Sequence, residues 1–141
     1  MNEVALRRDL REVDWEALAN IYCRAPLGTP HPEKLRRSYE NCEVCCFAFS
    51  NDELVGAGRA ISDGETFATV CDLVVSPDFQ HQGIGRAVLR SILQQLAVPK
   101  VLLACIQGQE EFYRKEGFLK HKSVMALYEN HEWFVANGYL E

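Results

Sequence analysis

The spacing of hydrophobic residues along the chain changes between the period of a helix and the period of a strand. Apolar residues recur every three or four positions after Asp14, after Pro32 and from Gly83 to Leu96, which predicts three helices. Runs rich in apolar and strand-forming residues predict strands over residues 4–7, 44–49, 54–61, 66–75 and 101–106. Because only short turns separate the segments 44–49, 54–61 and 66–75, these three strands are expected to form an antiparallel meander.

The end of the chain has a weaker pattern. Residues 110–116 predict a short helix that ends at Gly117, residues 118–128 a hairpin, and residues 131–134 a helical turn. No repeat, low-complexity tract or linker interrupts the 141 residues, of which 48% are hydrophobic and 25% charged. These values are ordinary for a globular protein, so we expect one domain over residues 1–141.

The charge and hydropathy of the chain argue against two classes of partner. The formal net charge is −5, and only residues 7–8 and 34–37 are locally basic, so we expect no nucleic-acid partner. No apolar run is long enough to span a bilayer, and the first ten residues are too charged for a signal peptide. We therefore expect a cytoplasmic protein with no membrane contact. The acidic balance suits a cationic amine as substrate.

Six cysteines raise the question of a metal or disulfide site; they stand at positions 23, 42, 45, 46, 71 and 105. A cytoplasmic domain of this length does not need disulfides. Cys42, Cys45 and Cys46 look like half of a zinc site, but no second Cys-x-x-Cys or His-x-His pair follows at zinc spacing. We therefore expect no bound metal, and thiols that are buried in or beside strands.

The segment Gln80-His81-Gln82-Gly83-Ile84-Gly85-Arg86 follows a predicted strand and opens a predicted helix. The first turn of a helix has unpaired backbone N–H groups and a partial positive charge, and glycines let a ligand approach the backbone. This arrangement predicts a site for a phosphate or pyrophosphate. It is not a P-loop, because no Gly-Lys-Ser/Thr follows, and it lacks the Gly-x-Gly-x-x-Gly register of a dinucleotide site. Tight packing of the helix on a strand is the alternative role of the two glycines.

Two motifs resemble those of the GNAT superfamily of N-acetyltransferases. Residues Gln80 to Gly85 are similar to the family's Gln/Arg-x-x-Gly-x-Gly/Ala motif, and residues Phe112 to Phe118 are similar to its Phe-Tyr-x-x-x-Gly-Phe segment. The motifs stand in the family's order and at about its spacing. The resemblance implies a mixed α/β fold of three layers, with a central, mostly antiparallel sheet between helices on both faces. In it, the parallel strands over residues 66–75 and 101–106 would splay apart.

The resemblance also implies acetyl-CoA as a co-substrate and assigns residues to it. The pyrophosphate would lie on backbone N–H groups in the motif that Gln80 opens, those of Gln82, Gly83, Ile84, Gly85 and Arg86. The pantetheine arm would pair with the strand backbone of Leu73, Val74 and Val75.

Direct attack of an amine on a thioester needs no metal, but the amine must lose its proton and the leaving thiolate must be stabilised. Tyr113 matches the family's tyrosine that donates a hydrogen bond or proton to the leaving sulfur; a purely packing role is the alternative.

Family members that carry a Glu or His as the general base place it at positions matching Thr69 and Cys71. Neither of these two residues is a competent base at neutral pH. Asp72 is the nearest carboxylate. Strand alternation points it to the face opposite Cys71 and Leu73 unless a bulge intervenes. A water chain to solvent, or binding of an already neutral amine, is the alternative to a base.

These expectations describe an N-acetyltransferase that acts on a primary amine in a ternary complex. The lack of an appended recognition domain favours a small-molecule acceptor over a protein or peptide, and residues 25–39 and the last hairpin would select it. A non-catalytic sensor that binds acyl-CoA is the alternative from another class, because no base is obvious. Family members often dimerise, so a homodimer is a further expectation.

Overall fold

The computed structural model describes residues 3–141 of the chain. It consists of two compact units, one that extends to Ala104 and one that covers Cys105–Glu141, and each is described by itself. The expectation of a single domain over residues 1–141 stays a prediction. No helix within residues 3–141 has the length and apolar character needed to cross a membrane.

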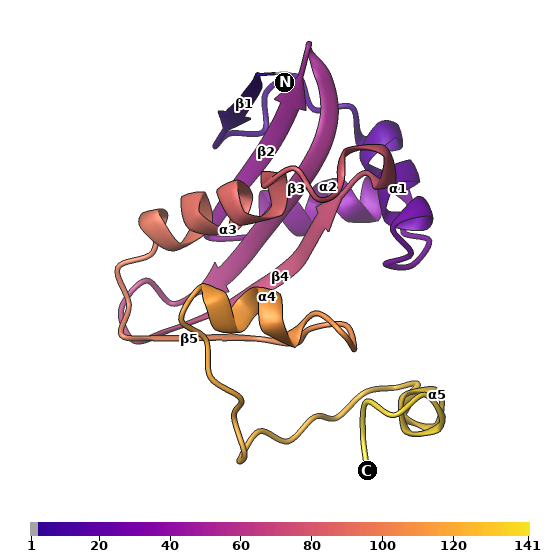
Figure 1. The fold of residues 1–141 in the computed structure, drawn as a ribbon, viewed down its shortest axis with the longest axis vertical. Coiled ribbons are helices and arrows are strands. Elements are labelled where there is room, and N and C mark those ends of the chain that lie inside the picture. Colours follow the sequence, from indigo (N-terminus) through magenta and orange to yellow (C-terminus); the bar gives the residue numbers. More distant parts are fainter. Residues whose placement is uncertain (1–2) are drawn as a thin grey trace. The chain divides into compact units, whose positions relative to one another are not determined.

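The first unit is built on a five-stranded mixed sheet (Figure 1). Its strands are β1 (Val4–Arg7), β2 (Val44–Ser50), β3 (Glu53–Ser62), β4 (Phe67–Val75) and β5 (Lys100–Leu103), and they lie in this order across the sheet. Neighbours from β1 to β4 pair antiparallel, whereas β4 and β5 pair parallel. The predicted meander and the parallel pair are both confirmed. The last strand ends at Leu103, three residues earlier than its apolar run suggested.

Helices cover both faces of this sheet. Helices α1 (Trp15–Arg24) and α2 (Pro32–Glu40) pack on one face, and α3 (Ile84–Gln95) packs on the other (Figure 1). A short 3₁₀ turn, η1 (Pro77–Phe79), leads from β4 toward α3. Helix α1 begins directly after Asp14, as the sequence predicted. The Asp14 side chain caps the helix by accepting a hydrogen bond from the Ala17 N–H at 3.0 Å.

Strand β3 shows how the two faces differ. Ala57 belongs to the apolar cluster formed with α1 and α2. The next residue, Gly58, faces α3, and a Cβ atom there would lie only 2.8 Å from Ile92 Cδ1. The missing side chain therefore lets α3 approach the sheet closely. The predicted three layers are confirmed, and Val88 and Ile92 on the apolar face of α3 are fully buried.

The second unit contains helices α4 (Glu110–Lys115) and α5 (His131–Ala136) and no strand. The helix at residues 110–116 and the helical turn at 131–134 are confirmed within a residue or two, and Gly117 has the expected left-handed φ of 96°. The hairpin predicted over residues 118–128 is wrong. Its apolar side chains, such as Leu119 and Leu127, are exposed, and no backbone ladder forms there. Strand propensity alone does not supply the partner that a strand needs.

Candidate active site

A β-bulge interrupts the pairing of β3 with β4. Between two paired positions, β3 contributes Gly58 alone, whereas β4 contributes Asp72 and Leu73. Asp72 has a φ of 55°, a left-handed conformation that Asp adopts more readily than most residues. Leu73 points toward α3, and Asp72 lies on the face covered by α1 and α2. Strict alternation, which would have turned Asp72 to the face opposite Cys71, is therefore broken at this point.

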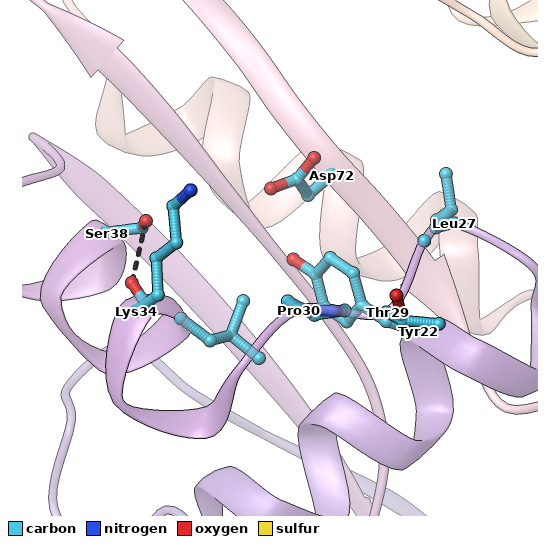
Figure 2. Close-up of a pocket in the computed structure, with 9 residues that line it drawn as sticks. Tyr22, Leu27, Thr29, Pro30, Lys34, Ser38 and Asp72 are labelled. Carbon is cyan, nitrogen blue, oxygen red and sulfur yellow. Dashed lines mark hydrogen bonds between the residues drawn. The ribbon is translucent and has the colours of Figure 1, made fainter.

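Asp72 stands in a cleft of about 320 Å³ on the α1 and α2 side of the sheet. The nine residues that line it are Tyr22, Leu27, Gly28, Thr29, Pro30, Lys34, Leu35, Ser38 and Asp72. Figure 2 shows the Asp72 carboxylate, the Tyr22 hydroxyl and the Lys34 ammonium directed into the same space. Seven of the nine residues come from the segment 25–39, where the sequence predicted the residues that select an acceptor.

The charge of Asp72 is paired at the wall of the cleft. Arg59 Nη2 of β3 donates a hydrogen bond to Asp72 Oδ2 at 3.0 Å, and the Arg59 side chain is only 14% exposed. The guanidinium also lies over the ring of Tyr39, 5.8 Å from its centroid. These contacts hold the carboxylate in place beside the bulge.

Tyr22 adds a hydroxyl group to the cleft. Its oxygen lies 3.4 Å from the hydroxyl oxygen of the buried Tyr39. Burial, with the negative charge of Asp72 as the second cause, raises the pKa of Tyr22 above its ordinary value. Tyr22 therefore remains a neutral hydrogen-bond donor and acceptor at every physiological pH.

The start of α3 is open to a ligand. Gly83 precedes the helix with a φ of 83°, no side chain caps it, and its first turn contains no acidic residue. The first helical hydrogen bond joins the Ala87 N–H to the Gly83 carbonyl at 3.1 Å, so the amides of Ile84 and Gly85 precede the regular ladder. A Cβ atom at Gly83 would meet nothing within 4 Å. The geometry fits an anion such as a phosphate group.

Of the other residues of this motif, two contact the sheet and the remaining three are exposed to solvent. Gln80 donates from Nε2 to the Val75 carbonyl at 3.1 Å, which fastens the loop to the end of β4. Ile84 is buried, with its Cγ2 atom against Gly56 of β3. Gln82 and Arg86 are exposed. His81 is exposed as well, with a left-handed φ of 65°.

The parallel pair of strands separates near the same end of β4. The β4–β5 ladder runs from Phe67 paired with Lys100 to Val70 paired with Leu103, and there it ends. Beyond Val70, β4 pairs with β3 on its other edge through Cys71, Val74 and Val75, and the bulge residues Asp72 and Leu73 lie between these pairs. Its free edge can accept hydrogen bonds from an extended ligand, as the pantetheine arm would require.

Tyr113 lies in the second unit, on α4. Its ring centroid is 4.9 Å from that of Phe112 and 5.9 Å from that of Phe118, so the motif residues pack on one another. Burial, with the nearby Cys105 thiol as a smaller cause, raises the pKa of Tyr113 to about 12. The phenol is therefore protonated at neutral pH and can donate a hydrogen bond.

Several other residues with side chains suited to acid–base or metal chemistry have structural roles. His31 Nδ1 accepts a hydrogen bond from the Glu33 N–H at 3.2 Å and so caps α2. The six thiols are free, and Cys45 and Cys46 are buried in β2 as expected. Cys23, by contrast, is exposed on α1, so the expectation of burial is wrong for it. Within residues 3–141, no three His, Cys, Asp or Glu side chains are grouped to hold a metal ion.

Sequence reasoning missed two charged residues of this site. Arg59 is the only charged residue in the segment 54–61, and that isolation was the available signal. Lys34 belongs to the short basic run at residues 34–37 and is exposed on α2. Nothing in the sequence separates Lys34 from Arg36 and Arg37; only the position of α2 shows that Lys34 lines the cleft.

The comparisons with known proteins match acetyltransferases. The family model described as "Acetyltransferase (GNAT) domain" matches residues 41–120. Serotonin N-acetyltransferase 2, chloroplastic, of Oryza sativa subsp. japonica is 33% identical over 121 residues, which cover 81% of this chain and 60% of the rice protein. The uncharacterized N-acetyltransferase ycf52 of Pyropia yezoensis is 38% identical over 74 residues, 50% of this chain and 42% of the relative. The matched regions thus span about half the length of these relatives.

A solved structure supports the same fold. A protein of unknown function from meticillin-resistant Staphylococcus aureus, described as a probable acetyltransferase, superposes with a TM-score of 0.79. The superposition covers 89% of this chain and 98% of that one, at 21% sequence identity. At this identity the comparison bears on the fold alone.

Proposed function

The chain belongs to the GNAT family of acetyltransferases, and on that premise we propose that it transfers the acetyl group of acetyl-CoA to the primary amine of a small molecule, by direct attack in a ternary complex. The observation that carries the proposal is the cleft beside the bulge. It brings a carboxylate, Asp72, to a solvent-accessible space next to the strand whose free edge suits pantetheine. Acetyl-CoA supplies an activated thioester when bound, and the remaining requirements fall on the protein.

Three features of the first unit fit acetyl-CoA. The uncapped start of α3 offers backbone N–H groups and the positive end of a helix dipole to the pyrophosphate. Gly83 leaves open space where a side chain would otherwise stand. The unpaired edge at Leu73, Val74 and Val75 offers backbone groups to the pantetheine amides. No metal is required for any of these contacts.

Proton handling at the acceptor is assigned to Asp72. An ammonium group in the cleft would find the carboxylate, whose Oδ2 is fixed by Arg59 while lone pairs remain for a second donor. Asp72 then orients the amine and takes up its proton, directly or through one water molecule. Tyr22, which stays protonated, can hold that water by its hydroxyl.

Stabilisation of the leaving thiolate is assigned to Tyr113, on its match to the family motif. The pKa of Tyr113 is raised to about 12, whereas an ordinary thiol has a pKa of about 8.5. Complete proton transfer from Tyr113 to a thiolate is therefore uphill. Hydrogen-bond donation to the sulfur is therefore the better description of its role.

The experiment is the release of free thiol from acetyl-CoA across a panel of amines, with acetyl-CoA binding measured by calorimetry on the same sample. We expect binding together with amine-dependent thiol release. Binding without turnover on a broad panel would favour the acyl-CoA sensor, and turnover only of a peptide N-terminus would favour a protein acceptor. Absence of binding would contradict the proposal outright.

A further inference from the structure

The acceptor cleft carries an unbalanced positive charge. Only two of its nine lining residues, Lys34 and Asp72, are charged. The negative charge of Asp72 is matched by Arg59 at 3.0 Å. Lys34 has no such match, because it forms no ion pair with any residue of the described part of the chain. The lining residues together with Arg59 therefore comprise two cations and one anion.

Lys34 is placed to act on a bound molecule. It lies on the first turns of α2, and its ammonium is directed into the space that the Asp72 carboxylate and the Tyr22 hydroxyl also face (Figure 2). One helical turn later, the Ser38 hydroxyl donates to the Lys34 carbonyl at 3.0 Å and lines the same wall. Lys34 thus presents a flexible cation at the α2 wall, whereas Asp72 presents an anion at the strand.

We infer that the acceptor carries an anionic group, a carboxylate or a phosphate, in addition to its amine; this inference rests on the proposed function of the same cleft. The amine pairs with Asp72 and the anionic group with Lys34. A simple cationic amine, such as an arylalkylamine or a polyamine, would bring a further positive charge into a site that already has an excess of it. An amino acid or an amino-phosphate has both charges that the cleft matches, and a cleft of about 320 Å³ is of the size that holds a small ligand.

The test compares amines that differ only in the anionic group. Thiol release is measured with phenylalanine against phenethylamine, and with O-phosphoethanolamine against ethanolamine. We expect the wild-type protein to favour the anionic member of at least one pair by about tenfold or more in kcat/KM, mainly through KM. The two pairs distinguish a carboxylate from a phosphate. Equal or better turnover of the amines without an anionic group would overturn the inference.

Variants of α2 assign the preference to Lys34. Lys34→Gln should abolish it, and Lys34→Arg, which keeps the charge, should retain most of it. The matched control is Arg37→Gln, which removes a charge from the same helix at an exposed position outside the cleft. A preference that survives Lys34→Gln, or one that Arg37→Gln abolishes equally, would refute the role of Lys34.

A failure of the proposed function is distinguishable from a failure of this inference. If no amine gives thiol release, calorimetric titration of phenylalanine and O-phosphoethanolamine into the protein decides the matter. Binding that Lys34→Gln weakens and Arg37→Gln does not would support an anion-accepting cleft. Absence of binding by both compounds would overturn it.

Discussion

Arg59 Nη2 and Asp72 Oδ2 lie 3.0 Å apart, beside the bulge that interrupts the pairing of β3 with β4. The pair is asymmetric, because 14% of the Arg59 side chain is exposed but 35% of the Asp72 side chain. The arginine is therefore the structural partner, packed over Tyr39, and the carboxylate is the partner that remains available to a ligand. This arrangement leads to separate predictions for the two residues.

Asp72→Asn should lower kcat/KM for the acceptor amine by about 10²-fold, the usual contribution of a positioned general base. The binding of acetyl-CoA should remain unchanged, because the start of α3 does not involve this side chain. Thiol-release kinetics and calorimetry on the same variant measure the two effects. Asp52→Asn, in the exposed turn between β2 and β3, is the matched control. Wild-type activity in Asp72→Asn would eliminate Asp72 as the base.

Arg59→Met should destabilise the fold by about 1–2 kcal/mol, since it leaves Asp72 without its partner in a partly buried site. The loss is smaller than for a fully buried pair because water still reaches the carboxylate. The double variant Arg59→Met/Asp72→Asn should cost less than the sum of the single variants, since neither charge is then left alone. Urea unfolding of the four proteins measures this coupling. Strictly additive costs would mean that the ion pair contributes nothing to stability.

Gly83→Ala should weaken acetyl-CoA binding by about tenfold or more, because it places a methyl group in the open space before α3 and strains a backbone with φ of 83°. The strain alone should cost about 1 kcal/mol of stability. Gly64→Ala is the control, since Gly64 has a similar φ of 78° in a turn between β3 and β4. Both variants should lose comparable stability by urea unfolding, and only Gly83→Ala should lose affinity in calorimetry. Equal affinities would remove Gly83 from the binding site.

Tyr113→Phe should lower kcat by about 10–100-fold with little change in KM, since the hydrogen bond to the leaving thiolate matters only as the C–S bond breaks. A donor is lost as pH rises through its own pKa, and the pKa of Tyr113 is raised to about 12. Loss of Tyr113 as a donor should therefore produce no fall in rate between about pH 8 and about pH 10. Pre-steady-state thiol release at several pH values tests both points. Tyr128→Phe, in the same unit, is the control; an equal effect of both variants would argue for packing alone.

The order of the elements could be predicted from the sequence because local chemistry decides it. Asp14 and Pro32 mark helix starts by their capping geometry and fixed φ, and period-3.6 spacing from Gly83 predicts α3 without further information. The two motifs predicted the family for the same reason, since each encodes a local backbone structure. The hairpin at residues 118–128 could not be predicted in this way, because a strand exists only where another strand meets it.

The sequence by itself determined the helices, the meander and the glycine-rich start of α3, all of which depend on neighbours within a few residues. Only the tertiary structure decided what Asp72 and Lys34 can do. The extra residue of β4 in the bulge reverses the direction of the side chains before it relative to those after it. Neither the composition nor the hydrophobic period of the sequence predicts that reversal. The charge of the cleft likewise depends on Arg59, 13 residues from Asp72 along the chain, and on the packing of α2, because electrostatic matching is set by distance in space.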